Sequence, residues 1–210
     1  MTALVFANGE LPSQGLVMEL AASASLIVAA DGGADKALAA DVTPHYAVGD
    51  LDSISARARA ALPAGHVISH PSEDATDLEK AIGFCVERGE TDVVVVAGGG
   101  GRADHALANL SVLPLFRGRA RVRLIDDLFE ISLVEGTVRI EGRPGTVVSL
   151  VSIGLSREVT TSGLRWDLAS VDLRFSPLGV HNELVGTSAT VSVREGDLLL
   201  FLGRWVERHG

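Results

Sequence analysis

Residues 26–53 of the chain read LIVAADGGADKALAADVTPHYAVGDLDS, and this stretch indicates the fold class. Two short apolar runs, Leu26–Ala30 and Tyr46–Val48, predict buried strands, and each is followed at once by Gly or Asp. The alanine-rich segment Ala34–Ala40 between them predicts a helix. Strand, helix and strand in this order are typical of a parallel sheet with helices on its faces.

The same alternation continues on both sides of this stretch. Further strands are predicted at Leu4–Ala7, Val67–Ile68 and Val93–Ala97. Further helices are predicted at Ser55–Leu62, Asp77–Arg88 and Ala103–Leu113. In parallel sheets of this kind, ligands bind beyond the carboxyl ends of the strands. We therefore expect the chemistry in the loops that directly follow the strands.

After about residue 126 the pattern changes to short β-like runs separated by turn signals, with no convincing helix between them. These runs are Phe129–Leu133, Thr137–Glu141, Val147–Ile153, Leu164–Leu168, Ala189–Val193 and Leu198–Leu202. We expect an N-terminal α/β domain with a mostly parallel sheet at residues 1–126. A C-terminal all-β sandwich or barrel is expected at residues 127–210.

Composition excludes several classes of protein. The chain has 210 residues, of which 47% are hydrophobic, as in ordinary globular proteins. No run of about 18 apolar residues occurs, so no membrane-spanning helix is expected. A single cysteine, Cys85, excludes an intrachain disulfide framework. The first residues do not resemble a secretory signal, and we expect a cytoplasmic protein.

The charge balance narrows the partners. A net charge of −9 has the wrong sign for a protein that binds a nucleic-acid backbone. Both lysines, Lys36 and Lys80, are followed by alanine, so the Gly-Lys-Ser/Thr motif of a P-loop is missing. Phosphates would have to be bound by arginine, backbone N–H groups and metal ions.

The loops after the predicted strands are rich in acidic residues and glycine. They contain Asp31-Gly32-Gly33, Gly49-Asp50-Leu51-Asp52-Ser53, the segment Pro71–Asp77 and the segment Gly98–His105. Acids at one end of neighbouring strands repel one another unless a cation lies among them, and hard oxygen ligands suit Mg²⁺. Each loop alone has a structural explanation, such as a turn, or a helix cap at Thr76 or Asp77. The four loops together favour a Mg²⁺ site.

The glycine run has two functional interpretations. Gly98-x-Gly100-x-x-Ala103 fits the dinucleotide fingerprint, with Asp126 as its ribose-binding acid. That fingerprint belongs on the first strand of its fold, however, and here at least four predicted strands precede it. We favour a phosphate-binding turn of backbone N–H groups at a helix N-terminus, with Arg102 supplying charge. A tight turn that needs glycine is the structural alternative.

Several motifs together resemble the thiamin pyrophosphokinase family. In the first half they are Ala30-Asp31-Gly32-Gly33-Ala34, Gly49-Asp50-Leu51-Asp52-Ser53-Ile54, Asp74-x-Thr76-Asp77 and Gly101-Arg102-x-Asp104-His105. In the second half they are Thr161-Ser162-Gly163-Leu164-Arg165-Trp166-Asp167-Leu168 and Val180-His181-Asn182-Glu183. The resemblance spans most of the chain.

This resemblance implies a fold, a reaction and an assembly. The fold is an N-terminal α/β domain followed by a C-terminal β-sandwich. The reaction moves a pyrophosphoryl group from ATP to the hydroxyethyl oxygen of thiamin and leaves AMP, with Mg²⁺ as cofactor. The assembly is a homodimer whose active sites lie where the subunits meet.

The resemblance also implies residue roles. Implied catalytic residues are Asp50, Asp52, Asp74 and Asp77, of which Asp50, Asp52 and Asp74 would bind the metal. Implied ATP and phosphate contacts are Asp31, Gly32, Gly33, Thr76, Gly100, Gly101, Arg102 and Asp104. Implied thiamin contacts are Trp166, His181 and Asn182.

Two residues depart from the family pattern, and other functions stay open. Glu73 stands where the family usually has lysine or glutamine, and His181 where it usually has serine. One alternative is a dinucleotide-binding oxidoreductase that uses Gly98–Ala103. Another is a thiamin- or nucleotide-binding protein without catalysis, and a more distant one is a metal-dependent glycosyltransferase. Trp166 could also be an ordinary core or interface residue.

Overall fold

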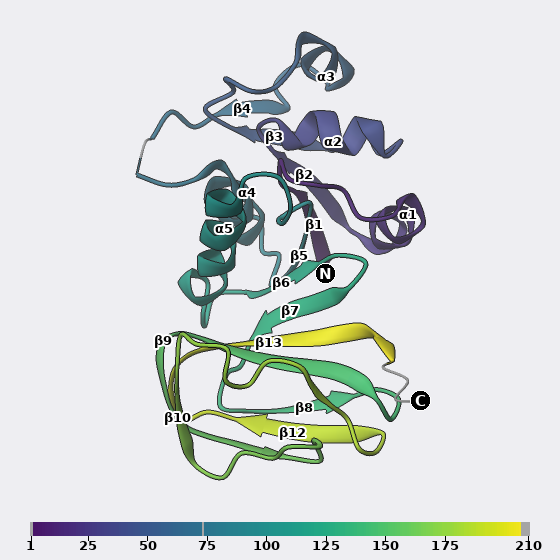
Figure 1. Cartoon of the computed structure of the whole chain (residues 1–210). Coiled ribbons are helices and arrows are strands. Elements are labelled where there is room, and N and C mark those ends of the chain that lie inside the picture. The colour runs from purple at the N-terminus through teal and green to yellow at the C-terminus, as the bar shows by residue number, and fades with distance from the viewer. Residues whose placement is uncertain (1, 73, 207–210) are drawn as a thin grey trace. The chain divides into compact units, whose positions relative to one another are not determined.

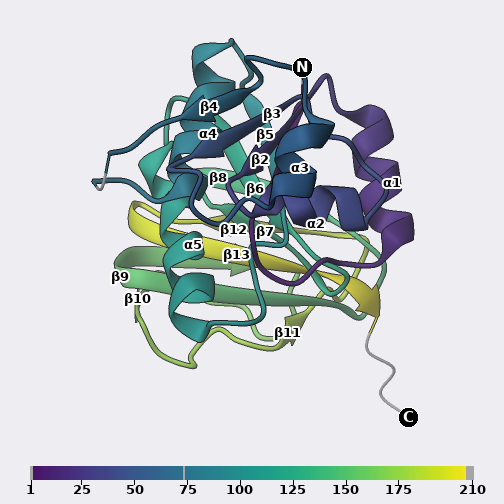
Figure 2. The ribbon, with the colours of Figure 1, turned by 90° about the horizontal axis from the view of Figure 1, so that it is seen from above.

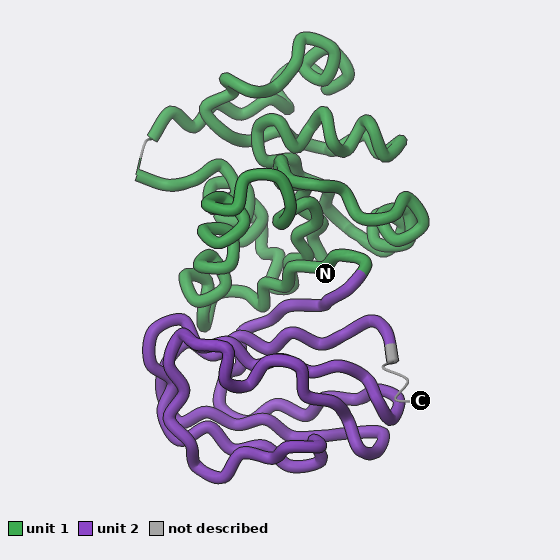
Figure 3. Tube along the Cα trace, in the orientation of Figure 1, with its two compact units in different colours: residues 1–127 green, residues 128–210 purple. Residues whose placement is uncertain are grey.

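The computed structural model describes residues 2–72 and 74–206. The chain divides into two compact units, residues 1–127 and 128–210 (Figure 3). Glu73, one of the two departures from the family pattern, lies outside the described residues.

The described part of the first unit contains six parallel strands, which confirms the predicted α/β class. They are β1 (Thr2–Phe6), β2 (Leu26–Ala30), β3 (Tyr46–Gly49), β4 (Val67–Ser69), β5 (Asp92–Val96) and β6 (Arg121–Ile125). Their order across the sheet is β4-β3-β2-β1-β5-β6. Successive residues of β1, such as Leu4 and Val5, are both buried, because helices cover both faces of a parallel sheet.

Within residues 2–72 and 74–127, five helices cover the two faces of this sheet. They are α1 (Gln14–Ser23), α2 (Gly33–Ala39), α3 (Ala56–Ala61), α4 (Asp77–Glu87) and α5 (Ala103–Leu115). Helices α1, α2 and α3 lie on one face, and α4 and α5 lie on the other (Figures 1 and 2). The sequence did not predict α1: Leu16, Val17 and Leu20 pack on the core, but the equally apolar Met18 between them is exposed and obscures the helical spacing. Among the described residues, no helix is long and apolar enough to cross a membrane.

The second unit is an antiparallel β region, as predicted. Its strands are β7 (Phe129–Leu133), β8 (Thr137–Glu141), β9 (Thr146–Ser162), β10 (Val171–Arg174), β11 (Asn182–Glu183), β12 (Ser188–Ser192) and β13 (Glu195–Val206). The long strand β9 pairs with β13 along most of its length and with β12 at its end. One apolar core contains Leu150 of β9, Val191 of β12 and Leu198 of β13.

The predicted strand at Leu164–Leu168 is wrong, because this segment is a loop. Leu164 makes only an isolated bridge with Leu184. The Asp167 carboxylate accepts hydrogen bonds from the N–H groups of Gly163 at 3.2 Å and Leu164 at 3.1 Å. It also accepts one from the Thr161 hydroxyl at 3.1 Å. A side chain therefore satisfies backbone groups that a neighbouring strand would otherwise bind.

Candidate active site

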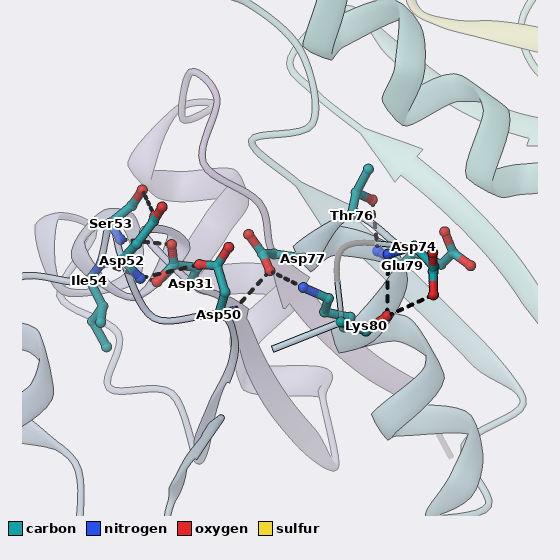
Figure 4. A network of polar contacts seen from close by, with 11 residues as sticks. Asp31, Asp50, Asp52, Ser53, Ile54, Asp74, Thr76, Asp77, Glu79 and Lys80 are labelled. Carbon is teal, nitrogen blue, oxygen red and sulfur yellow. Dashed lines mark hydrogen bonds and ion pairs between the residues drawn. The ribbon is translucent and has the colours of Figure 1, made fainter. Parts of the chain in front are cut away.

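Three carboxylates meet at the carboxyl edge of the parallel sheet (Figure 4). Asp31 follows β2, Asp50 follows β3, and Asp77 is the first residue of α4. Each offers one oxygen, and these oxygens all lie within 4.8 Å of one another. We call Asp31, Asp50 and Asp77 the three-carboxylate group. Of the metal ligands expected from the sequence, only Asp50 belongs to it.

Glycine 49 allows these carboxylates to approach. A Cβ atom at this position would lie 2.9 Å from Cβ of Asp31 and 2.9 Å from Oδ1 of Asp77. Both distances are shorter than real Cβ contacts, so any side chain at Gly49 would push the two acids aside. The glycine in Gly49-Asp50-Leu51-Asp52 therefore has a packing reason that the sequence does not reveal.

Asp31 is the buried member of the three-carboxylate group. Its side chain accepts hydrogen bonds from the backbone N–H groups of Ser53 at 2.9 Å and Ile54 at 3.1 Å. These bonds hold the loop after β3 against the end of β2. Burial raises the pKa of the Asp31 carboxyl, the N–H of Ser53 opposes that rise, and the charge of Asp77 adds to it. The net direction is upward, so the fold disfavours the ionised form.

Asp77 is held by two hydrogen bonds to one oxygen. Its Oδ1 accepts the Lys80 ammonium at 3.1 Å and the backbone N–H of Asp50 at 3.2 Å. The Lys80 side chain is only 3% exposed. Asp77 also lies in the first turn of α4, where the helix dipole favours a negative charge.

Asp52 and Asp74, the other expected metal ligands, are exposed and lie outside the three-carboxylate group. The Asp52 carboxylate accepts the Ser53 hydroxyl at 2.7 Å. The Asp74 backbone N–H donates to the Ser72 hydroxyl at 3.2 Å.

Thr76 caps α4, because its hydroxyl oxygen accepts a hydrogen bond from the N–H of Glu79 at 3.2 Å.

The two glycine motifs are tight turns. Gly100 and Gly101 have positive φ values of 73° and 62°, which glycine adopts at little cost. The N–H of Gly101 donates to a Glu10 carboxylate oxygen at 3.2 Å. The sequence did not single out Glu10, which no motif marks.

In the motif Asp31-Gly32-Gly33, the glycines allow a close backbone approach. A Cβ at Gly33 would lie 2.1 Å from the carbonyl oxygen of Phe6, and one at Gly32 would meet the Asn8 side chain.

Arg102 and Asp104 form an exposed ion pair at the start of α5. The guanidinium donates from Nε at 3.1 Å and from a terminal nitrogen at 2.6 Å. Hydrogen bonding to Arg102 lowers the pKa of the Asp104 carboxyl to about 2. The Arg102 guanidinium thus pairs with Asp104 through two nitrogens while most of its surface stays exposed.

The expected thiamin residues lie together in the second unit. The Trp166 side chain is 57% exposed. Asn182 Oδ1 accepts the backbone N–H of Trp166 at 3.1 Å, and its Nδ2 donates to the Trp166 carbonyl at 2.7 Å. The amide of Asn182 thus holds the backbone of Trp166. His181 has φ of 62°, and its N–H donates to the Ser149 hydroxyl at 2.9 Å.

The site of the first unit defines a class of protein. Carboxylates at the ligand edge of a parallel sheet, together with a glycine turn and an oriented arginine, are typical of enzymes that act on nucleotide phosphates.

Comparison with known families identifies the particular kind. Residues 17–124 match the family model described as "Thiamin pyrophosphokinase, catalytic domain". Residues 136–198 match the one described as "Thiamin pyrophosphokinase, vitamin B1 binding domain". The chain belongs to the thiamin pyrophosphokinase family, and its activity by this membership is that of a thiamin diphosphokinase.

Curated relatives and solved structures agree with this membership. Thiamine pyrophosphokinase of Bacillus subtilis is 31% identical over 84% of this chain and 86% of its own. Thiamine pyrophosphokinase 2 of Oryza sativa is 30% identical over 94% of this chain and 84% of its own. The crystal structure of the Bacillus subtilis protein superposes with a TM-score of 0.82 at 25% identity, over 97% of this chain and 99% of that one.

The family and function predicted from the sequence are thereby confirmed. The oxidoreductase interpretation of Gly98–Ala103 and the glycosyltransferase interpretation of Asp50-x-Asp52 both fall away, because the catalytic-domain match covers both segments.

Proposed function

We propose that the chain transfers a pyrophosphoryl group from ATP to thiamin with Mg²⁺, and that the three-carboxylate group holds the ion. The observation that carries this proposal is the approach of Asp31, Asp50 and Asp77 to within 4.8 Å. Three carboxylate oxygens are hard donors that fit Mg²⁺, which completes its coordination with water and substrate phosphates. The bound ion supplies neutralisation of phosphate charge.

The two units divide the substrates between them. Residues 1–126 bind ATP and the ion, and residues 127–210 bind thiamin. The support for the first is the clustering of acids, glycine turns and Arg102 in the first unit. The match of residues 136–198 to a vitamin B1 binding model supports the second.

The transfer needs in-line positioning and one proton acceptor. The thiamin hydroxyl oxygen forms a bond to the β-phosphorus of ATP, while the bond from that phosphorus to the oxygen that leaves with AMP breaks. The hydroxyl proton passes to a carboxylate. Asp52 and Asp74 are exposed and lie outside the three-carboxylate group. We therefore assign them either to accepting this proton or to contacting the metal-bound nucleotide.

The phosphates meet backbone N–H groups and one arginine. We assign Gly100, Gly101 and the Asp31-Gly32-Gly33 turn to the nucleotide side, where the Gly101 N–H that now bonds Glu10 has to change partner to reach a phosphate. Arg102, oriented by Asp104, binds a phosphate oxygen. Thr76 supports the same edge indirectly, because it caps the helix that begins with Asp77.

The thiazolium ring of thiamin is a cation, and an indole face attracts a cation by about 0.5–2 kcal/mol. Trp166 offers an exposed indole in the second unit. The Asn182 side chain holds the Trp166 backbone through two hydrogen bonds. His181 is the residue directly before Asn182 in the chain. We assign these three residues to the thiamin side.

The family resemblance also implies a homodimer. In its support, the second unit exposes large apolar side chains at Phe175, Leu178, Val180 and Val185, each at least 50% exposed. Exposed apolar side chains in this number are typical of a protein interface.

The reaction is tested by incubating the purified protein with ATP, thiamin and Mg²⁺ and resolving the nucleotide products. We expect AMP in amounts equal to thiamin diphosphate, and no turnover when a chelator removes Mg²⁺. Formation of ADP would contradict pyrophosphoryl transfer. Binding of both substrates without turnover would favour the non-catalytic alternative.

A further inference from the structure

A lysine side chain is buried directly beside the three-carboxylate group. Lys80 lies one turn into α4, its residue is 8% exposed, and its side chain is 3% exposed. Its ammonium group lies 3.1 Å from Oδ1 of Asp77. Figure 4 shows the Lys80 side chain reaching toward Asp77, on the side away from Asp31. A buried ammonium is costly unless a carboxylate pairs with it, so this position is built for a charge pair.

The burial of Lys80 separates it from the usual phosphate-binding lysine. A lysine that contacts ATP phosphates needs an exposed ammonium, as in a P-loop. With 3% of its side chain exposed, Lys80 reaches Asp77 and not a nucleotide in solution. Its effect on the reaction therefore passes through the carboxylates.

Counting charges shows what that effect is. Ionised Asp31, Asp50 and Asp77 contribute three negative charges. Lys80 contributes one positive charge, and the sum of −3 and +1 is −2. This balance matches one divalent cation, and Lys80 keeps its place in it because its own side chain is 3% exposed, while that of Asp77 is 30% exposed.

We propose that Lys80 is a positioning residue that sets the valence of the cation held by the three-carboxylate group. It fixes Asp77 through Oδ1 and gives the group the net charge that one divalent ion neutralises. This inference rests on the proposed metal site. It needs neither ATP nor thiamin for its test, so its failure can be told apart from a failure of the proposed reaction.

The test compares two ions of similar size and different charge. Ca²⁺ and the lanthanide Tb³⁺ both prefer hard oxygen ligands, and Tb³⁺ carries one more positive charge. The ratio of their dissociation constants, Ca²⁺ over Tb³⁺, therefore reports the electrostatic potential at the site. We would measure both constants by calorimetry on the full chain, without nucleotide.

Lys80→Met removes the charge and keeps an unbranched apolar side chain in the buried space. We expect the ratio to rise about tenfold or more, because the third charge of Tb³⁺ no longer meets the Lys80 ammonium. Lys80→Arg keeps the charge, and its ratio should stay within about threefold of the parent value. An unchanged ratio in folded Lys80→Met would overturn the proposal.

A second pair of variants covers the case in which Lys80→Met fails to fold. Asp77→Asn alone leaves Lys80 with two carboxylates, and Asp77→Asn combined with Lys80→Met removes both members of the buried pair. The double variant should show a ratio about tenfold above that of Asp77→Asn. Equal ratios in these two variants would contradict the assigned role.

Two controls assign the signal to this site. Asp50→Asn should weaken binding of both ions, which shows that the measured sites include the three-carboxylate group. Lys36→Met changes the only other lysine, which has no ion pair with any described carboxylate, and should leave the ratio unchanged. If the parent protein binds neither ion, both the metal site and the role of Lys80 are wrong.

Discussion

Single side chains at the sheet edge carry the candidate chemistry. The sequence placed acids in four consecutive loops after predicted strands, and several of these acids also hold backbone or side-chain groups of the fold. Asp31 holds the loop after β3 through two backbone N–H groups, and Asp77 holds Asp50 and Lys80. Asp50 differs, because its carboxylate is exposed and bonds only the N–H of Asp52, at 3.2 Å, among the described contacts. Asp50 is therefore the member whose loss should affect catalysis with least effect on folding.

Asp50→Asn should lower kcat/KM by at least about a hundredfold, because an amide binds Mg²⁺ more weakly and carries no charge. The melting temperature should change little. Steady-state kinetics at saturating Mg²⁺ checks the first statement and calorimetry checks the second. Glu87→Gln at the far end of α4 is the matched control, an exposed acid that should retain full activity. Full activity in Asp50→Asn would remove Asp50 from the site.

Asn182→Asp tests whether Asn182 acts through Trp166. The change replaces the Nδ2 donor by an oxygen that repels the Trp166 carbonyl, while the acceptor for the Trp166 N–H is kept. We expect the KM for thiamin to rise about tenfold, which corresponds to the loss of one or two hydrogen bonds. The KM for ATP, measured in the same preparation, should not change. Equal rises in both constants would indicate general damage to the fold.

At the scale of the element, the end of β3 decides how closely the acids approach. The backbone of Gly49 passes between Asp31 and Asp77, and helix α4 begins at that point with Thr76 as its cap. The Asp50 N–H joins the end of the strand to the first residue of the helix. Strand end, loop and helix start therefore form one connected support for the site.

Gly49→Ala should reduce activity strongly and destabilise the protein by about 1–3 kcal/mol, because its Cβ would overlap Asp31 and Asp77. Denaturant unfolding and kinetics measure the two effects. Gly83→Ala in α4 makes the same chemical change where no atom lies within 4 Å. This control should be neutral or more stable by up to about 1 kcal/mol. If both variants behave alike, Gly49 has no special packing role.

At the scale of the whole molecule, the stability of the protein should depend jointly on pH and Mg²⁺. The fold raises the pKa of Asp31, so its contribution to stability is fully present when the carboxyl is protonated and is lost as the pH rises through the folded-state pKa. A bound divalent ion offsets that loss by stabilising the ionised form. The increase in melting temperature caused by Mg²⁺ should therefore grow from about pH 4 to about pH 7. An increase that does not vary with pH would contradict this linkage.

The proposed homodimer is the other property of the whole molecule. Light scattering should give a mass about twice the 21.9 kDa of the chain. Val185→Asp places a charge on a side chain that is 63% exposed in the single chain, and it should yield a folded monomer. Met18→Asp, on an exposed position of α1, is the control and should remain dimeric. A parent protein of single-chain mass would refute the dimer.

Much of the fold was predictable from the sequence, since its signals are local. Strand β2 has the predicted bounds, and α4 ends one residue before its predicted end. The segment Leu164–Leu168 was mistaken for a strand because its apolar residues alternate like those of a strand, while Asp167 closes it into a loop. Helix α1 was not predicted because an exposed apolar residue, Met18, interrupts the pattern of its core-facing residues Leu16, Val17 and Leu20.

The sequence by itself determined the family, the α/β and antiparallel β regions, and the edge of the sheet where the acids gather. It did so because periodicity and motif spacing are properties of neighbouring residues. Only the tertiary structure decided that Asp31 and Asp77 join Asp50, that Asn182 holds Trp166, and that a buried Lys80 pairs with Asp77. These contacts depend on strand order, on the space left by Gly49 and on where α4 begins. The chain acquires them only when its distant segments pack together.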